Sequence, residues 1–404
     1  MRILMLHNRY LVAGGEEAAV ADDAALLQEH GHQVELLEKD NREIKRIGKA
    51  GAALSTLWSR DSYERVKEIL QAGHFDILHV HNFFPLWSPS VYYAASRAGV
   101  PVVQTLHNYR LMCVNSFLFR NGKVCEECVH RWLPWPGVVH GCYRESRTGS
   151  AVISGMIGLH KLLNTWQSKV QVYIAVSEFA REKYIAGGFP AEKIMVKPNF
   201  VSPSPLPGSG GGGFALYVGR LSPEKGIANM LKAWETADRC IPLKVVGDGP
   251  LATQVEAAAA TTNSIQYLGR KSSGEVLELM RQAEFLVFPS EWYETMGRTV
   301  LEALAVGTPV LTSALGERAS LIVPGRNGFH FPAGDVNALR ERVEWCSQNL
   351  PQVRSLRKAA RLVFEQKFTG PQNVALLLNI YHQAQQRYQE ASNGNTNRRW
   401  YKTK

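Results

Sequence analysis

The sequence predicts two doubly wound α/β domains, each a parallel sheet covered by helices. Short apolar strands alternate with helical segments in the first half of the 404-residue chain, and the same alternation restarts in the second half. An uncharged segment rich in glycine and proline separates the halves at residues 198–213. Because strands buried on both faces of a parallel sheet are continuous apolar runs joined by helices, this pattern favours two Rossmann-like domains of similar size.

Residues 1–197 are expected to form the N-terminal domain. The expected elements, in chain order, are strand 2–7, helix 16–31, strand 33–37, helix 63–72, strand 76–81, strand 101–106 and strand 170–177. Each strand is a short apolar run, as is typical of a strand inside a parallel sheet. Residues 108–145 are too long for a plain connection and are expected to form an insertion.

Residues 198–213 hold four prolines, five glycines and no charge, a composition that predicts a linker rather than part of a core. The second domain is expected over residues 214–370. Its expected strands are 214–218, 243–247, 265–267, 285–289 and 309–312. Residues 371–391 are expected to form a helix that packs back toward the N-terminal domain, and the basic tail 392–404 is expected to be disordered.

The composition is that of a folded protein whose positive charge could attract nucleic acid, anionic lipid headgroups or phosphorylated substrates. Hydrophobic residues make up 45% and charged residues 20% of the chain, and the net charge is 46 − 36 = +10. No RNA-binding signature or basic heptad helix accompanies this charge. The longest mostly apolar run without Asp, Glu, Lys or Arg, residues 77–96, contains His, Asn and Pro, so it is not expected to span a membrane. The N-terminal apolar run is too short for a signal peptide, and we expect a cytoplasmic protein.

The most informative segment is residues 285–305, in which a buried strand, a loop and a helix follow one another. The loop carries Glu294, and the helix is expected to begin between Thr295 and Gly297 and to carry Glu302. The first amides of a helix lack partners and can hold phosphate oxygens. A carboxylate at the loop tip and another in the helix can accept hydrogen bonds from the hydroxyls of a polyol. An ordinary acidic helix start remains the alternative for this segment taken alone.

Two other strand-to-helix turns carry residues suited to a phosphorylated ligand. Arg220 and Lys225 follow the first strand of the second domain, where two cations can neutralise a diphosphate. Gly14 and Gly15 follow the first strand of the chain and allow a ligand to approach the backbone at a helix N-terminus. Surface charges and a plain tight turn are the alternatives.

With these motifs together, the chain resembles the retaining GT-B glycosyltransferases of the group-1, or GT4, family over nearly its whole length, to about residue 390. The family marker, two glutamates separated by seven residues, is met by Glu294 and Glu302. The resemblance implies that Arg220 and Lys225 hold the donor diphosphate and that Glu302 binds the ribose hydroxyls.

By the same resemblance, Glu294 and the amides of Met296 and Gly297 face the donor sugar, Gly14 and Gly15 contact the donor, and His107 lies beside the sugar. The expected catalytic residues are therefore Glu294, His107, Arg220 and Lys225. Many relatives carry Pro-Phe-Gly after the first glutamate where this chain has Thr-Met-Gly, which leaves the identity of the sugar open. The implied donor is a UDP- or GDP-sugar, and the implied acceptor is a glycan or a lipid-linked glycan of the cell envelope or exopolysaccharide.

The sequence contains no Asp-x-Asp motif, which removes the usual short clamp between a metal ion and a diphosphate. We therefore expect catalysis without a metal ion, with cations and a helix N-terminus stabilising the leaving group. No carboxylate can be assigned as a nucleophile for double displacement. The other functions considered are an epimerase or phosphorylase of the same fold and a scaffold that binds sugar nucleotides or glycans without turnover.

Four of the six cysteines fall within thirty residues and favour a structural zinc site. These are Cys113, Cys125, Cys128 and Cys142. Thiols in a Cys-x-x-Cys pair with two flanking cysteines suit tetrahedral zinc in a cytoplasmic protein, although buried thiols without metal remain the alternative. The surrounding insertion, 108–145, is expected to lie on the acceptor side.

Two further segments leave alternatives open. His79 and His81 share one face of an expected strand, so they either bind a metal ion or, more plausibly for His81, hydrogen-bond within the cleft. Residues 151–166 are apolar and either pack against the sheet or rest on a membrane surface, which makes peripheral membrane association an open option.

Overall fold

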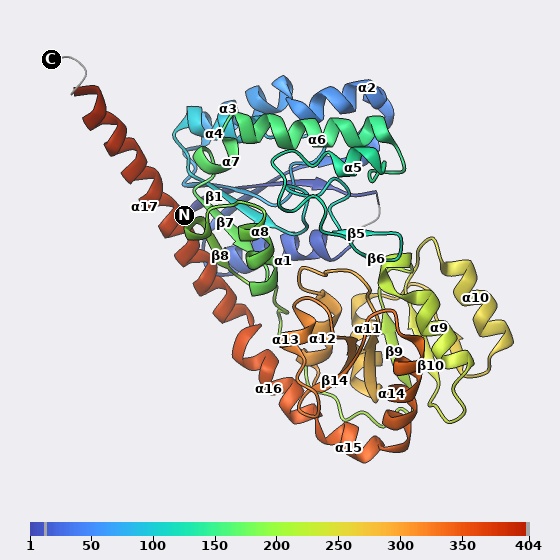
Figure 1. Cartoon of the computed structure of the whole chain (residues 1–404). Coiled ribbons are helices and arrows are strands. Elements are labelled where there is room, and N and C mark those ends of the chain that lie inside the picture. Colours follow the sequence, from blue (N-terminus) through green and yellow to red (C-terminus); the bar gives the residue numbers. More distant parts are fainter. Residues whose placement is uncertain (12–13, 401–404) are drawn as a thin grey trace. The chain divides into compact units, whose positions relative to one another are not determined.

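The computed structural model describes residues 1–11 and 14–400, with side chains described as far as residue 393 (Figure 1). Within this part of the chain, the fold divides into two compact units. The first unit comprises Met1–Phe117, Glu126–Lys197 and the chain from Asn373 onward, and the second comprises Leu118–Cys125 and Pro198–Gln372. Each unit contains one six-stranded sheet.

The sheet of the first unit is parallel throughout, with strand order β2-β1-β3-β4-β7-β8. Its strands are β1 (Arg2–Arg9), β2 (Gln33–Asp40), β3 (Ile77–Val80), β4 (Val102–Leu106), β7 (Val172–Ala175) and β8 (Ile194–Val196). The four residues of β3 and those of β7 are all buried, as their continuous apolar sequences predict.

Helices connect these strands and complete the first unit. They are α1 (Gly15–Glu29), η1 (Asn41–Glu43), α2 (Ile44–Leu57), α3 (Arg60–Gly73), α4 (Ser90–Ala98), α5 (Pro136–Val139), α6 (Arg147–Leu162), α7 (Thr165–Ser168), α8 (Glu178–Ala186), η2 (Ala191–Lys193) and α17 (Gly370–Trp400). Helices α3, α6 and α8 each have a serine as their N-cap residue. The hydroxyl oxygens of Ser59, Ser146 and Ser177 each accept a hydrogen bond from an amide in the first helical turn.

The second unit repeats this architecture, with parallel strand order β11-β10-β9-β12-β13-β14. Its strands are β9 (Ala215–Val218), β10 (Leu243–Val246), β11 (Ile265–Tyr267), β12 (Phe285–Phe288), β13 (Val310–Ser313) and β14 (Gly328–Phe331). Its helices are η3 (Pro223–Lys225), α9 (Ile227–Glu235), α10 (Ala252–Thr261), α11 (Ser273–Gln282), α12 (Arg298–Ala305), α13 (Arg318–Leu321), α14 (Val336–Gln348), α15 (Leu350–Ser355) and α16 (Arg357–Lys367). The short hairpin of β5 (Phe119–Arg120) and β6 (Lys123–Val124) groups with this unit. The expected fold of two doubly wound α/β domains is confirmed.

The glycine-rich segment 198–213 differs from the expected linker, because it packs on the second unit. The amides of Gly208, Gly210 and Gly212 donate to backbone carbonyls of Val306, Arg281 and Gln282 at 2.8–3.0 Å. A Cβ on Gly208 would lie 2.3 Å from the carbonyl oxygen of Arg281, so the close approach requires glycine there. The glycines of segment 198–213 therefore allow close contact with the backbone of the second unit, rather than the flexibility of a linker.

Helix α17 corrects the expectation for the C-terminal tail. The sequence predicts a helix over 371–391 and disorder from residue 392, whereas α17 extends to Trp400. Leu377, Ile380 and Tyr381 of this helix are buried, and a helix anchored in this way propagates at little cost into residues of low helix propensity. The expectation for residues 401–404 lies outside the described residues. None of the helices in the described ranges is both long and apolar enough to cross a bilayer.

Candidate active site

The second unit places Lys225 beside Glu294, at the carboxyl ends of two neighbouring strands. Lys225 lies in the turn after β9, and Glu294 lies in the loop after β12. Because β9 and β12 pair side by side, their following loops meet at one edge of the sheet. The Lys225 ammonium forms an ion pair with Glu294 Oε1. This edge is where open α/β sheets bind ligands.

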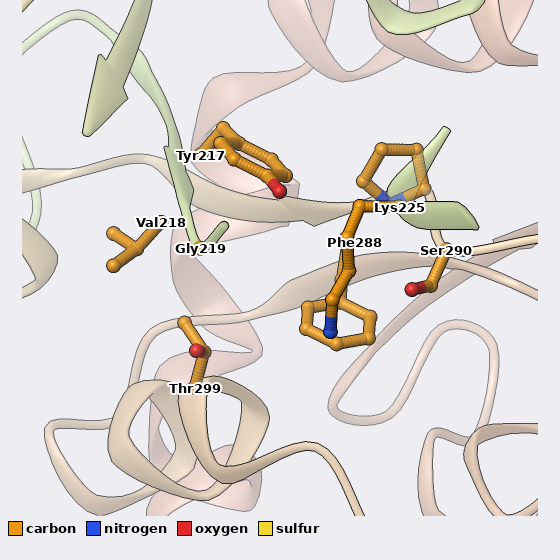
Figure 2. A pocket seen from close by; sticks show the side chains of 8 residues that line it. Tyr217, Val218, Gly219, Lys225, Phe288, Ser290 and Thr299 are labelled. Atoms are coloured by element: carbon orange, nitrogen blue, oxygen red, sulfur yellow. The ribbon is translucent and has the colours of Figure 1, made fainter. Parts of the chain in front are cut away.

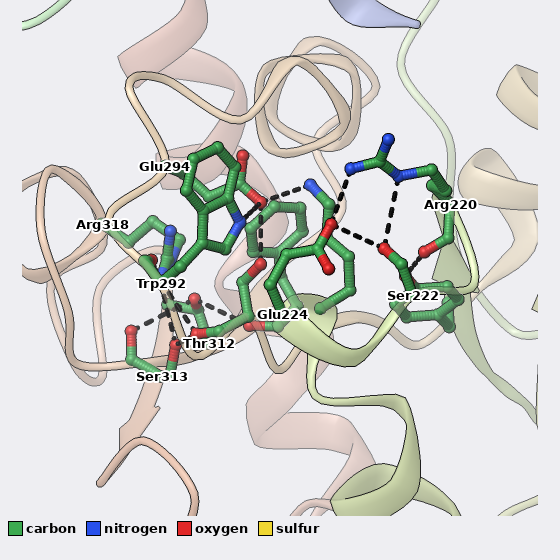
Figure 3. A network of polar contacts seen from close by, with 12 residues as sticks. Arg220, Ser222, Glu224, Trp292, Glu294, Thr312, Ser313 and Arg318 are labelled. Atoms are coloured by element: carbon green, nitrogen blue, oxygen red, sulfur yellow. Dashed lines mark hydrogen bonds and ion pairs between the residues drawn. The ribbon is translucent and has the colours of Figure 1, made fainter. Parts of the chain in front are cut away.

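Glu294 is 7% exposed and is held by three hydrogen-bond donors (Figure 3). Its Oε1 accepts from Ser290 Oγ at 2.7 Å, from Trp292 Nε1 at 3.0 Å and from Lys225. Burial by itself raises the pKa of this carboxyl, but the nearby charges of Lys225 and Arg318 and these hydrogen bonds outweigh it, so the pKa is lowered overall. Glu294 is therefore an oriented carboxylate at neutral pH.

The Arg220 guanidinium, 46% exposed, lies in the same turn as Lys225. It donates to Glu224 Oε1 at 2.6 Å and to Ser222 Oγ at 3.3 Å. The Ser222 hydroxyl in turn donates to Glu224 at 2.7 Å, which fixes the carboxylate between two donors. Arg220 thus keeps most of its donor groups toward solvent while Glu224 sets its orientation.

Gly226 makes this turn possible. Its φ is +70°, and a Cβ there would lie 2.2 Å from the carbonyl oxygen of Pro289, which is backbone and cannot move aside. Only glycine fits, so the turn that carries Lys225 approaches the loop that carries Glu294 as closely as two backbones can.

A small hollow lies beside these residues (Figure 2). It is lined by Tyr217, Val218, Gly219, Lys225, Phe288, Pro289, Ser290 and Thr299. The Lys225 ammonium also lies 5.7 Å from the ring centroid of Phe288 and 5.6 Å from that of Trp292, distances at which aromatic rings attract a cation. The hollow therefore has a cationic wall and aromatic sides.

Helix α12 follows the Glu294 loop. Gly297 is its N-cap residue, as expected from the sequence, and Met296 just before it is 2% exposed. Glu302 lies within the helix, where its Oε1 accepts from Arg298 Nε at 2.9 Å. The amide of Val300 donates to the carbonyl of Gly297 at 2.9 Å, which closes the first turn. The N-terminus of a helix favours negative charge, so this end of α12 is suited to an anion.

Arg318 is a residue of this site that the sequence analysis did not single out. It is fully buried, and its Nη2 donates to the backbone oxygens of Ser290 and Trp292 at 3.0 and 3.3 Å and to Ser313 Oγ at 3.1 Å (Figure 3). It therefore fixes the backbone that positions Glu294. One arginine among many in the sequence carries no signal for such a role.

In the first unit, His107 follows β4 and contacts His81, which follows β3. The two rings are stacked, with His107 Nε2 3.0 Å from His81 Nδ1. Burial, followed by the charges of His7 and Lys197, lowers the pKa of His107 to about 3, so this imidazole is neutral at physiological pH. Both histidines line a hollow together with Asn108 and Arg110.

His79 is a structural residue. Its Nδ1 lies 2.8 Å from the Tyr381 hydroxyl and its Nε2 lies 2.7 Å from Thr105 Oγ1. These partners occupy both ring nitrogens of His79, so this residue serves the packing of the first unit rather than a metal site shared with His81.

The Gly14 and Gly15 pair stands at the start of α1, as predicted. Gly14 has an extended backbone, with φ −142° and ψ −161°, and Gly15 is the first helical residue. Glu17 closes this helix end by accepting from the amide of Gly14 at 2.8 Å and from that of Tyr10 at 3.0 Å. The position is exposed and open to a ligand.

The expectation of a zinc site in the cysteine-rich insertion is not supported. No group of three or more His, Cys, Asp or Glu side chains within the described ranges is placed to hold a metal ion. Cys125 belongs to the second unit, whereas Cys113, Cys128 and Cys142 belong to the first. Cys113 Sγ instead lies 3.0 Å from Asn115 Oδ1. Cys125 lies twelve positions after Cys113 along the chain and Cys142 lies fourteen positions after Cys128, so the sequence does not require these thiols to meet.

Comparison with known proteins gives the same picture along nearly the whole chain. Residues 13–204 match a family described as Glycosyltransferase Family 4, and residues 206–363 match one described as Glycosyl transferases group 1. An uncharacterized glycosyltransferase of Methanocaldococcus jannaschii is 29% identical over 193 residues, which cover 47% of this chain and 54% of that protein. A phosphatidyl-myo-inositol mannosyltransferase of Mycobacterium leprae is 26% identical over 351 residues, 82% of this chain and 83% of the relative.

Among solved structures, Anabaena Alr3699/HepE in complex with UDP is similar in fold, with a TM-score of 0.64 at 18% identity over 94% of this chain and 99% of that one. The same protein is also known in complex with UDP-glucose. The two family matches together span residues 13–363 apart from residue 205, and the fold is similar to that of HepE over nearly the whole chain. The chain belongs to the group-1, or family 4, glycosyltransferases and has the GT-B fold.

Proposed function

We propose that this glycosyltransferase moves a sugar from a UDP- or GDP-sugar to a glycan or lipid-linked acceptor, with retention of configuration and without a metal ion. A role in the assembly of the cell envelope or of an exopolysaccharide fits this chemistry. Support for the donor class comes from HepE, which binds UDP and UDP-glucose, and support for a lipid-linked acceptor comes from the relative named for phosphatidyl-myo-inositol.

The observation that carries the proposal is the Lys225 and Glu294 pair beside the hollow at the carboxyl ends of β9 and β12. In this proposal Lys225 and Arg220 stabilise the negative charge that develops on the departing diphosphate. Such preorganised charges commonly contribute about 2.7–4 kcal/mol each to transition-state stabilisation. Arg220 supplies the exposed, forked donor set suited to phosphate oxygens, and Lys225 supplies a point charge.

The sugar end of the donor would contact groups that hydrogen-bond without carrying positive charge. Glu294 accepts from a sugar hydroxyl, the amides of Met296 and Gly297 donate to another, and Glu302 binds the ribose. His107, which is neutral, would contribute a hydrogen bond rather than a charge. With no carboxylate assigned as a nucleophile, retention would follow from attack by the acceptor on the face that the leaving group departs from.

A screen for slow donor hydrolysis tests this proposal without knowledge of the acceptor. The purified protein is incubated with UDP- and GDP-sugars, with and without EDTA, and release of nucleoside diphosphate is measured. We expect one donor to be hydrolysed at a rate that EDTA does not change. Binding of a donor without any release would favour the scaffold, and conversion of the sugar nucleotide to its epimer would favour an epimerase.

We also propose that the protein associates peripherally with a membrane, through an exposed surface of the first unit. Trp132 and Trp135 are 57% and 49% exposed, the Arg131 guanidinium lies 4.9 Å from the centre of the Trp135 ring, and Lys161 donates to the Arg131 carbonyl at 3.1 Å. Leu162, at the end of α6, is 71% exposed. Exposed indole rings beside cations suit the headgroup region of an anionic bilayer.

Sedimentation with phosphatidylglycerol-containing vesicles tests this surface. The double variant Trp132→Ser and Trp135→Ser should lose most vesicle binding, whereas Leu206→Ser, which removes a more exposed apolar side chain from the second unit, should not. Equal binding of both variants and the wild type would refute the membrane role of this surface.

A further inference from the structure

Two neighbouring side chains of the first unit have buried polar atoms without hydrogen-bond partners. Among the described residues, His7 Nδ1, His7 Nε2 and Glu16 Oε1 have none. His7 lies near the end of β1 and is 1% exposed, and Glu16 is the second residue of α1. Folded proteins pair nearly all buried polar atoms, because an unpaired one loses its water without compensation. Unpaired atoms on two adjacent side chains therefore point to a ligand.

The geometry between them fits a single small polar group. His7 Nδ1 and Glu16 Oε1 are 3.9 Å apart, which is too far for a direct hydrogen bond. An oxygen placed about 2.8 Å from both atoms would form an angle near 90° between them, within the range that a hydroxyl accepts. The other carboxyl oxygen of Glu16, Oε2, already accepts a hydrogen bond from Asn108 Nδ2 at 3.4 Å. The same Asn108 amide group also donates to the Tyr10 hydroxyl at 3.4 Å.

We propose that His7 and Glu16 form a binding site for a sugar hydroxyl, with Asn108 orienting the carboxyl group. The hydroxyl would donate to one of the two side chains and accept from the other. This inference rests on the proposed function for the origin of the sugar, which is either the donor or the acceptor.

The protonation states favour a neutral hydroxyl over a phosphate or an amine. Burial and then the charge of Glu17 raise the pKa of Glu16 to about 8, with the hydrogen bonds from Asn108 and Tyr10 and the charge of Arg110 acting in the opposite direction. Burial lowers the pKa of His7 to about 4. Near pH 7 both groups are mainly uncharged, and each can donate as well as accept.

Asn108 connects this pair to the hollow that His81 and His107 line. The side-chain amide of Asn108 therefore contacts the Glu16 carboxyl, and Asn108 also lines that hollow. A sugar in the hollow would place a hydroxyl toward the pair.

The test compares variants that remove hydrogen bonding with one that keeps it. Glu16→Leu and His7→Phe abolish the paired donors and acceptors, whereas Glu16→Gln keeps a neutral side chain that donates and accepts. Glu29→Leu, at the exposed end of the same helix, is the matched control. Each variant is assayed for donor hydrolysis and for transfer to methyl α-D-glucoside and methyl α-D-mannoside, and thermal unfolding verifies the fold.

If the hydroxyl belongs to the donor, Glu16→Leu and His7→Phe should raise the KM of hydrolysis at least tenfold. If it belongs to the acceptor, hydrolysis should persist while transfer falls at least tenfold. Glu29→Leu should stay within about threefold of the wild type, and Glu16→Gln should recover part of the activity that Glu16→Leu loses. Unchanged hydrolysis and transfer in Glu16→Leu, or a loss in Glu16→Gln as large as in Glu16→Leu, would overturn the inference.

A second readout separates this inference from the proposed function. In protein labelled at histidine and glutamate, the ring nitrogen signals of His7 and the carboxyl carbon signal of Glu16 should shift when UDP-glucose or methyl α-D-glucoside is added. A wild type that turns over no donor but shows these shifts would refute the proposed function alone. Absence of shifts with both sugars would overturn the hydroxyl site.

Discussion

Replacing Lys225 by methionine removes one charge from the candidate site and keeps most of the side-chain length. Lys225 and Glu294 have side-chain exposures of only 18% and 9%, so the variant leaves a nearly buried carboxylate without its cation. Breaking a buried pair in this way costs about 3–5 kcal/mol. Because Glu294 keeps its hydrogen bonds from Ser290 and Trp292, we expect about 2–3 kcal/mol, near or below the lower end of that range.

For a unit of this size, that loss corresponds to a fall in Tm of about 4–12 °C. Turnover should fall further, because Lys225 would stabilise the departing diphosphate with about 2–4 kcal/mol, which is roughly a 30- to 900-fold decrease in kcat/KM. Glu294→Ala should lose turnover to a similar extent, through loss of sugar positioning. The assays are thermal unfolding of the purified variants and donor hydrolysis under identical conditions.

The double variant Lys225→Met and Glu294→Gln distinguishes stability from catalysis. Removing both charges should recover much of the lost stability, because no unpaired buried charge remains, but it should not restore turnover. Arg281→Met, in the exposed ion pair with Glu278, should change neither property. Wild-type rates in both single variants, or recovery of turnover in the double variant, would refute the assignment of this site.

Four other predictions concern stability and metal dependence. Donor hydrolysis should survive exhaustive chelation, and a loss with EDTA that magnesium restores would contradict the metal-free mechanism. Lys197→Met should destabilise the first unit by about 3–5 kcal/mol in denaturant titrations, because it leaves the buried Asp23, 2.8 Å away, without its cation. The pKa of Glu294 is lower in the folded protein than in the unfolded chain, where it is about 4.3. The ionised Glu294 should therefore stabilise the fold above pH about 4.3, and this contribution should be lost as the pH falls through the folded-state pKa. If Glu294→Gln left the dependence of stability on acid pH unchanged, this prediction would be wrong. Gly208→Ala should lower the Tm, since its Cβ would meet the Arg281 backbone, whereas a linker glycine would tolerate the change.

The central strands of both sheets could be predicted from the sequence because burial on both faces demands continuous apolar runs. The central strand at residues 285–288, for example, was predicted as 285–289. Strands β8 and β14 were missed, and each is at the edge of its sheet. An edge strand has fewer neighbours to pack against, so its sequence, such as Gly328–Phe331, carries a weaker apolar signal.

The candidate site was only partly predictable for a related reason. Sequence order places Lys225 and Glu294 after strands, and the fold rule for parallel sheets brings such residues to one edge. Their ion pair depends on β9 and β12 being neighbours, which strand order along the chain does not reveal. Likewise, the role of Arg318 depends on three acceptors from two segments, the loop after β12 and strand β13, and no spacing in the sequence records them.

Three cations in the loops and helix that follow β9 and β12 are each paired to a carboxylate. The pairs are Arg220 with Glu224, Lys225 with Glu294 and Arg298 with Glu302. A half-buried cation without a counter-charge is costly to desolvate, so the carboxylates make it possible to keep cations in place before any ligand binds. The donors are then oriented in advance and need little reorganisation when negative charge develops on a leaving group. Two of these carboxylates, Glu294 and Glu302, are also the ones proposed to bind hydroxyls, because a carboxylate that is fixed by one cation still has lone pairs to accept from a sugar. The ion pairs at the carboxyl ends of β9 and β12 therefore stabilise the folded second unit. They also suit a ligand that carries both phosphate groups and hydroxyl groups.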